Sequence, residues 1–150
     1  MSPRAVLAGV GLAILTACAI EPDVGPRLAG VCDNTDTQPR TSVSFSRDIR
    51  PLISRPVGGC GCHLPSSVGA GPGTQLSGLD LSSFMSLRAG GANSGARVVV
   101  AGEPCASIMY QKLSDSPPFG SRMPLNGPPF FDADQLRLLH DWIAEGANDN

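Results

Sequence analysis

The chain has 150 residues, with 11 basic and 13 acidic side chains and a formal net charge of −2. This length is typical of a single domain, and the even charge balance excludes proteins that bind nucleic acids or anionic surfaces through a basic face. Glycine and proline are abundant, at 18 and 14 residues, so we expect short elements of secondary structure separated by long loops.

The N-terminus has the pattern of a secretory signal. Arg4 precedes an apolar run, Ala5 to Thr16, that is too short to span a bilayer. The run leads into Leu15-Thr16-Ala17-Cys18, which resembles the bacterial lipobox, in which the cysteine is lipidated and becomes the new N-terminus. We therefore predict a lipoprotein signal peptide at residues 1–17 and a lipid on Cys18. The alternative is a general secretory signal with a chance cysteine.

The segment after the lipobox is predicted to be a disordered tether. Residues 18–42 contain no aromatic side chain and carry prolines among small polar residues, a composition that cannot bury enough apolar surface to fold. Ala19, rather than Asp, follows the cysteine, which by resemblance to Gram-negative lipoproteins favours the outer membrane. We expect a lipid-anchored protein on the periplasmic side of the bacterial cell envelope.

All the aromatic residues lie between Phe45 and Trp142, so we place the folded domain at residues 43–147. Its first element is predicted to be a brief helix. Asp48 is its expected N-cap, and Pro51 falls in its first turn, where the missing N–H costs little.

The next segments predict loops and short helices. Residues 65–78 have several glycines and no aromatic side chain, and are predicted to be a loop. Residues 79–89 are expected to hold one or two helical turns, and the β-branched run 97–101 is expected to be extended. Another helix should begin at Pro104.

The last helix has the clearest pattern. Asp132 is its predicted N-cap, and Gln135 completes a capping box. Apolar residues repeat at helical spacing as far as Ile143, and Gly146 is expected to end the helix. The fold class is therefore mainly α, with three to four short helices and long loops rich in glycine and proline.

One short stretch carries the main chemical signal. The sequence Gly58-Gly59-Cys60-Gly61-Cys62-His63 is close to C-x-x-C-H, the pattern that attaches haem, but a single residue separates its cysteines. A small domain buries limited apolar surface, and a haem would add apolar interior that its side chains lack.

Further segments occur around this motif in a fixed order. They are Val43–Leu52, Cys62-His63, Gly78–Leu81, Val100–Pro104, Ser121–Pro124 and Leu138–Ala147. Together they resemble the small cytochrome c-like domains of planctomycete and myxobacterial secreted proteins, over nearly the whole folded unit. The departure is at Gly59, where the family usually places its first cysteine.

The resemblance implies a small cytochrome c-like fold with one covalent haem c. It implies His63 as the proximal iron ligand and Met123 as the distal one. Imidazole and thioether both suit low-spin iron, and this pair raises the reduction potential. Pro124 favours an extended conformation at Met123, within a loop that would point an apolar side chain inward.

Other candidate ligands are less suited by position. Met109 lies on a helical stripe and is predicted to fill the core, and Met85 lies in a short helix beside Phe84. His140 is surrounded by apolar positions of the last helix and is predicted to be a rim or core histidine. A methionine at 123 that merely fills a gap beneath its loop is the alternative to ligation.

The cysteines pose a separate question. Residues two apart in a helical turn do not face the same way, so Cys60 and Cys62 are not expected to attach together. We predict one thioether, from Cys62, because it keeps its position directly before His63. Cys60 is then free to pair in an oxidising envelope, and Cys105 is favoured as its partner over Cys32.

These observations predict a membrane-tethered electron-transfer protein that passes one electron to a redox partner in the envelope and acts on no substrate. A haem-free, disulfide-stabilised binding or structural module is the alternative. Peroxidase-like activity would need an open iron position, which Met123 argues against. A zinc site of Cys60, Cys62 and His63 would be unusually crowded, and no hydrolase nucleophile pattern is present.

Overall fold

The computed structural model describes residues 32–150. The predicted signal peptide at residues 1–17 and the predicted lipid site at Cys18 lie outside these residues. Within the described part of the chain, no helix is both long enough and apolar enough to cross a membrane.

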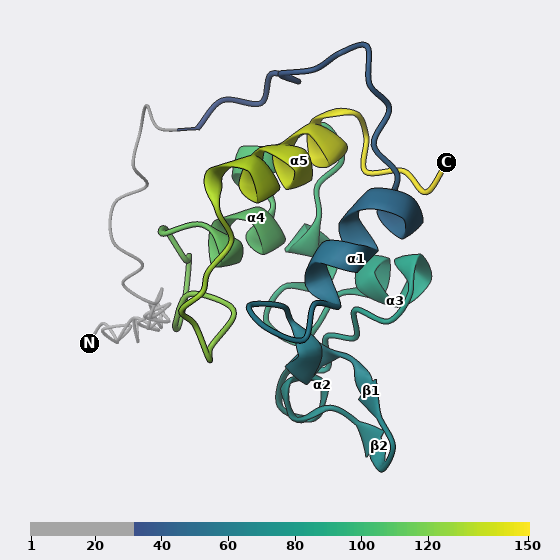
Figure 1. The fold of residues 1–150 in the computed structure, drawn as a ribbon, viewed down its shortest axis with the longest axis vertical. Coiled ribbons are helices and arrows are strands. Elements are labelled where there is room, and N and C mark those ends of the chain that lie inside the picture. The colour runs from purple at the N-terminus through teal and green to yellow at the C-terminus, as the bar shows by residue number, and fades with distance from the viewer. Residues whose placement is uncertain (1–31) are drawn as a thin grey trace, which may run out of the picture.

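The domain is mainly helical, with a single two-stranded sheet over residues 32–150 (Figure 1). The same residues contain five α-helices, where three to four were expected. The α-helices are α1 Arg50–Ile53, α2 Pro72–Ser77, α3 Phe84–Ala89, α4 Ile108–Leu113 and α5 Ala133–Ala144. The strands are β1 Pro65–Ser66 and β2 Gly69–Ala70, and shorter helical turns cover Phe45–Ile49, Gly61–His63, Gly95–Val98 and Pro104–Ala106.

Helix α5 forms as its sequence pattern predicts. The Asp132 carboxylate accepts the backbone N–H of Gln135 at 2.9 Å, and the Gln135 side chain accepts the N–H of Asp132 at 3.2 Å. This reciprocal pair is the expected capping box. Gly146 follows the helix with a φ of 104°, a left-handed conformation that glycine adopts without strain.

The core forms between α5 and the N-terminal helical turns. Phe45, Ile49 and Trp142 are fully buried there, and the ring centres of Phe45 and Trp142 lie 5.8 Å apart. The indole Nε1–H of Trp142 donates to the Asn148 carbonyl at 2.8 Å, so the one polar atom of this side chain is satisfied.

The first helix begins earlier than predicted. A π-helical turn, Phe45–Ile49, follows Ser44 and continues into α1. Asp48 is therefore inside the helix and not its N-cap, and its carboxylate accepts the backbone N–H of Ser44 at 2.8 Å. Buried apolar side chains recur every four residues as far as Ile53, and burial of this stripe explains the earlier start.

Residues 65–78 are not the loop that was predicted. Strands β1 and β2 form a hairpin in which Ser66 pairs with Gly69, and α2 follows. Helix α2 has Pro72 at its start and Gly78 at its end, where φ is 70°. The helix was missed because it buries no apolar stripe: Leu76 is 90% exposed, so hydrophobic periodicity is absent.

The segment before α4 is divided by a serine. The helix predicted from Pro104 is a 3₁₀ turn that ends at Ser107, after which α4 begins. The buried Ser107 hydroxyl accepts the N–H of Val100 at 2.8 Å and lies 3.0 Å from the Glu103 carbonyl. These side-chain bonds compete with a continuous helix. The predicted extended run 97–101 begins as a 3₁₀ turn and is extended at Val99.

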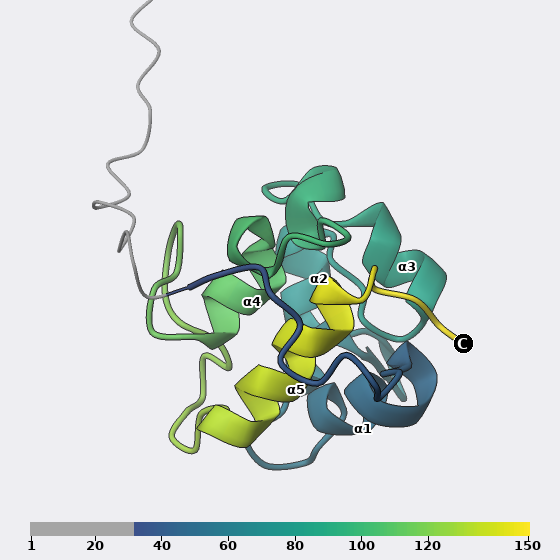
Figure 2. The same ribbon diagram turned by 90° about the horizontal axis from the view of Figure 1, so that it is seen from above.

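Residues 32–42, assigned to the tether from composition, run along α5 (Figure 2). The Thr37 backbone N–H donates to Asp141 at 3.0 Å, and His140 Nε2 lies 2.7 Å from the Asp33 carbonyl. The boundary predicted at residue 43 is therefore too late for the described part of the chain. The contacts that fix this segment are polar, and a prediction based on apolar composition does not detect them.

Candidate functional site

A cavity of about 210 Å³ lies between α4, the segment around residues 60–81 and the loop before α5. Both predicted iron ligands, His63 and Met123, are among the residues that line it, together with Cys60 and Met109. The rest of the lining is largely apolar and includes Leu79, Leu81, Val98, Ile108, Leu113 and Phe119. The structure thus brings an imidazole, a thiol and two thioethers to one apolar space.

Cys60 and His63 are held on the same side of a tight turn. The backbone N–H of His63 donates to the Cys60 carbonyl at 2.9 Å, and a 3₁₀ turn covers Gly61–His63. Side chains three residues apart in such a turn nearly eclipse one another. Cys60 is 7% exposed, and burial raises the pKa of its thiol to about 12, so the thiol is protonated at neutral pH.

The position before Cys60 is a glycine, Gly59, and its surroundings explain why no cysteine stands there. A Cβ atom added there would collide with the backbone carbonyl of Arg55. The N–H of Cys60 also donates to the Ile53 carbonyl at 2.7 Å, which holds the turn against the end of α1. Cys60, the next residue, lines the cavity.

The imidazole of His63 is oriented by a backbone carbonyl. Nδ1 of the ring lies 3.1 Å from the Leu79 oxygen, and because a carbonyl only accepts hydrogen bonds, Nδ1 carries the proton in this contact. Nε2 then keeps its lone pair, which is the form that binds a metal ion. A Cβ atom at Gly73 would lie 2.9 Å from Nε2, so glycine at this position keeps space beside that nitrogen.

Cys62 has a different environment from Cys60. Its side chain is exposed, and it is not among the residues that line the cavity. Its carbonyl faces α2, where a Cβ atom at Gly71 would lie 2.5 Å from the Cys62 oxygen. The thiol predicted to form the thioether is thus outside the cavity lining, and the thiol predicted to be free is inside it.

Met123 reaches the cavity from the loop that precedes α5. Its backbone N–H donates to the Lys112 carbonyl at 2.7 Å, at the end of α4. The Lys112 ammonium donates to the carbonyls of Phe119 and Ser121 at 2.7 and 2.6 Å. Burial lowers the pKa of Lys112 below its ordinary value. The loop therefore meets the helix through several hydrogen bonds.

The other methionines have distinct positions. Met109 is 6% exposed and belongs to the core, as predicted, but it also lines the cavity. Met85 is 76% exposed and lies outside the lining. A second thioether from Met109 was not expected in the cavity, because a helical stripe alone does not distinguish a core position from a cavity wall.

His140 is a buried and hydrogen-bonded histidine, as predicted. Its Nε2 lies 2.7 Å from the Asp33 carbonyl and its Nδ1 lies 3.2 Å from the Asp141 carboxylate. The ring also packs edge-on against Tyr110, with 5.6 Å between centres. Both ring nitrogens have partners, and His140 is not among the cavity-lining residues.

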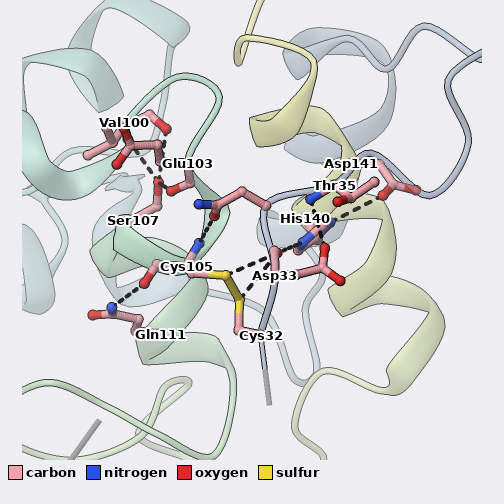
Figure 3. Close-up of a disulfide and its surroundings, with 11 residues drawn as sticks. Cys32, Asp33, Thr35, Val100, Glu103, Cys105, Ser107, Gln111, His140 and Asp141 are labelled. Atoms are coloured by element: carbon pink, nitrogen blue, oxygen red, sulfur yellow. Dashed lines mark hydrogen bonds and ion pairs between the residues drawn. A yellow bond between two sulfur atoms is a disulfide. The ribbon is translucent and has the colours of Figure 1, made fainter. Parts of the chain in front are cut away.

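The disulfide differs from the expected one (Figure 3). Cys105 is bonded to Cys32, with 5.8 Å between their Cα atoms, while Cys60 and Cys62 are free. Cys32 reaches Cys105 because residues 32–42 lie on the domain, where the Asn34 side chain accepts the N–H of Cys105 at 3.0 Å. Cys60 faces the cavity, and this explains why it is not the partner of Cys105.

The structure does not gather the ligands of a zinc site. Within residues 32–150, no group of three His, Cys, Asp or Glu side chains is close enough to hold a metal ion. Cys60 and Cys62 point to different environments, which separates the thiols that the zinc alternative required.

Two contributors to the site were missed in the sequence. Leu79 acts through its carbonyl oxygen, and a backbone atom leaves no mark on residue type. Lys112 lines the cavity and holds the loop of Met123. It is the only lysine in the chain, and it lies beside an apolar stripe. This position could have marked it as a candidate site residue.

Comparison of the chain with protein-family models, with curated proteins and with solved structures finds no match.

Proposed function

We propose that this chain is a membrane-tethered c-type cytochrome with a small cytochrome c-like fold, which carries one electron on a single haem c. The observation that carries the proposal is the position of His63 and Met123, which come from distant parts of the sequence and line one apolar cavity. An imidazole and a thioether are the axial ligands of electron-transferring cytochromes c.

The donor set supports haem more strongly than the size of the cavity does. Clefts for ligands of this class usually measure about 300–1,000 Å³, and this cavity measures about 210 Å³. Its walls must therefore separate for the macrocycle to enter. The wall that carries Met123 is a loop rich in glycine and proline.

The bound haem would supply an iron atom that gains and loses one electron. His63 would bind this iron through Nε2, while the Leu79 carbonyl fixes the ring and makes Nε2 more basic. Met123 would supply a second protein ligand to this iron, which argues against binding of peroxide, so we propose an electron carrier and not an enzyme. The apolar lining would exclude water and, with the thioether, favour the reduced state.

Attachment through one thioether, from Cys60, agrees best with the geometry. Cys60 shares the cavity and the turn with His63, whereas Cys62 is exposed. Attachment adds the S–H group of the cysteine across a vinyl group of the macrocycle. In this addition the S–H bond would break, one C–S bond and one C–H bond would form, the C=C bond would become single, and no oxidant would be consumed. This replaces the thioether to Cys62 that motif position alone predicted.

Two matched variants test the attachment. Cys60→Ala and Cys62→Ala would be produced in a host that matures c-type cytochromes, and peptides of each protein would be examined by mass spectrometry. The proposal expects haem on the peptide of Cys62→Ala and none on that of Cys60→Ala. The reverse result would return attachment to Cys62, and a native peptide without haem would reject covalent haem.

A haem-free binding or structural module of the cell envelope is the second candidate. Two observations favour it: the small volume of the cavity, and the Cys32–Cys105 disulfide, which stabilises the domain without a cofactor. Phe45 and Trp142 are fully buried in the present structure, so the core on that side needs no added group.

We further propose that the protein is anchored by a lipid at Cys18, on the periplasmic side of a bacterial envelope and preferably at the outer membrane. This part rests on the lipobox-like Leu15-Thr16-Ala17-Cys18. Its partner would be a redox protein of the same compartment. The near-even charge of the chain gives no basis for binding nucleic acid.

A further inference from the structure

We propose that Lys112 is a positioning residue for Met123: it fixes the loop of residues 119–123 so that the methionine lines the cavity. The role of Met123 as a ligand rests on the proposed function, but the contacts of Lys112 do not depend on any cofactor. Lys112 is the only lysine in the chain, so its ammonium is chemically unique among the side chains.

Lys112 makes four contacts with three residues of the loop. Its ammonium donates to the carbonyl oxygens of Phe119 and Ser121, at 2.7 and 2.6 Å. The same nitrogen lies 4.9 Å from the centre of the Phe119 ring. The backbone carbonyl of Lys112 accepts the N–H of Met123 at 2.7 Å. One residue thus holds the loop both before and at the methionine, which limits where the thioether can lie.

The place of Lys112 in α4 explains why the loop docks there. The last carbonyls of a helix have no partner within the helix, and Lys112 and Leu113 are the final residues of α4. Met123 N–H and Arg122 Nε supply partners for these two carbonyls, at 2.7 and 3.3 Å. A positive charge at this end also interacts favourably with the helix dipole. The loop thus supplies hydrogen-bond donors to the last carbonyls of α4, and these bonds hold the loop against the helix.

The ammonium has no competing partner in the described chain. Within residues 32–150 the ion pairs are Arg47–Asp48, Arg137–Asp134 and His140–Asp141, so none involves Lys112. Its hydrogen bonds go to the two loop carbonyls, and such charge-assisted bonds are stronger than neutral ones. We therefore assign the attachment of the loop at Phe119 and Ser121 to this side chain.

Trypsin cleavage after Arg122 measures whether the loop is held. In the folded chain, Arg122 donates to the Leu113 carbonyl and its guanidinium lies 4.3 Å from the centre of the Phe130 ring, so cleavage requires the loop to open. When closing is fast, the cleavage rate follows the population of the open form. Lys112→Met keeps the apolar stem and removes the donors, and Lys112→Arg keeps donors.

We expect Lys112→Met to accelerate cleavage at Arg122 about tenfold, as the loss of one charge-assisted hydrogen bond predicts. Lys112→Arg should stay within about twofold of the native chain. Cleavage after Arg137, in the middle of α5, reports global unfolding and should not change. The proposal would be overturned if Lys112→Met did not accelerate cleavage at Arg122, or if it accelerated cleavage at Arg122 and Arg137 equally. It would also be overturned if Lys112→Met and Lys112→Arg accelerated cleavage at Arg122 equally.

Acylation of the native chain provides a second measurement if Lys112→Met does not fold. An amine-reactive acyl ester removes the charge of this one lysine side chain without a change of sequence. The fraction acylated at Lys112 should be cleaved faster at Arg122 than the unmodified fraction. Equal rates would contradict the proposal that Lys112 holds the loop. These tests use the chain without haem, so they remain decisive even if the chain binds none.

In haem-loaded protein, two variants that add no thioether to the cavity should differ in their spectra. Lys112→Leu should weaken the near-infrared band of thioether ligation, and Lys112→Arg should retain it. A band of native strength in both variants would mean that Lys112 does not position Met123.

Discussion

Thr37 and Asp141, 104 residues apart in sequence, are joined by the backbone N–H and the hydroxyl of the threonine. The hydroxyl lies 2.6 Å from Asp141 Oδ2, and the amide nitrogen lies 3.0 Å from Oδ1. Asp141 is 2% exposed, so these donors satisfy a carboxylate that would otherwise be costly to bury. The pair fixes the N-terminal segment of the described chain on α5.

This pair makes stability depend on pH. Burial opposes ionisation of Asp141, but hydrogen bonds from Thr37 and His140 outweigh it and hold the pKa of the carboxyl below its ordinary value. The bonds therefore stabilise the fold above the unfolded-state pKa of about 4, and this stability is lost as the pH falls through the lower folded-state pKa. Thr37→Val should lower the free energy of unfolding by about 1–2 kcal/mol at neutral pH.

Urea unfolding at neutral and at acidic pH measures this effect. The cost of Thr37→Val should shrink at acidic pH, because a protonated Asp141 gains less from the lost donor. Thr41→Val, at an exposed threonine, is the matched control and should cost little at either pH. An equal cost of Thr37→Val at both pH values would disprove the assignment of Thr37 to the ionised carboxylate.

The Cys32–Cys105 disulfide closes a long loop, with a sequence separation of 73. A cross-link of this span restricts the unfolded chain, so the double variant Cys32→Ala/Cys105→Ala should lose about 2–4 kcal/mol of unfolding free energy. Denaturant unfolding of the variant and of the native protein gives this difference. Cys62→Ala, which removes an exposed free thiol, should leave the midpoint almost unchanged. An unaltered midpoint in the double variant would contradict the pairing.

The elements predicted correctly are those whose local signals and burial agree. Helix α5 has a capping box and a buried apolar face, so both signals place it. Helix α2 has only a proline and a glycine to mark it, since Leu76 is exposed. The packing of residues 32–42 depends on Asp141, far away in sequence, and no local pattern encodes such a contact.

Cys18 provides a test of location. If it is lipidated, several acyl chains contribute about 0.8 kcal/mol for each buried methylene and hold the protein on a membrane. Cys18→Ala should then move the protein to the soluble envelope fraction, as fractionation and immunoblotting would show. A variant whose signal is cleaved normally but which stays in the membrane fraction would contradict the lipoprotein prediction.

Met123 and Met109 both line the cavity, and the proposed function makes only Met123 an iron ligand. Met123→Ala should abolish the near-infrared band of thioether ligation in the oxidised protein and admit added ligands to the iron. Met109→Ala should keep the band and lower the stability by about 2–5 kcal/mol, because Met109 is buried. The near-infrared spectrum and the midpoint of denaturant unfolding would be measured for each variant. A band that survives in Met123→Ala would transfer the role of ligand to Met109.

The family resemblance paired His63 and Met123 as ligands, and both line the cavity. Their ligation of iron stays a prediction. The choice between Cys60 and Cys62 depended on which side chain lines the cavity, in a turn where Gly59 approaches the backbone of Arg55 closely. A three-dimensional close approach of this kind is not encoded in motif spacing.

The visible absorption spectrum of the purified protein, produced in a host that matures c-type cytochromes, tests the central claim most directly. The account predicts the sharp reduced-state bands of a low-spin haem, at one haem per chain, and their loss in His63→Ala but not in His140→Ala, because the ring nitrogens of His140 are already hydrogen-bonded. A folded native protein without these bands would contradict the account and leave the haem-free module as the function of the domain.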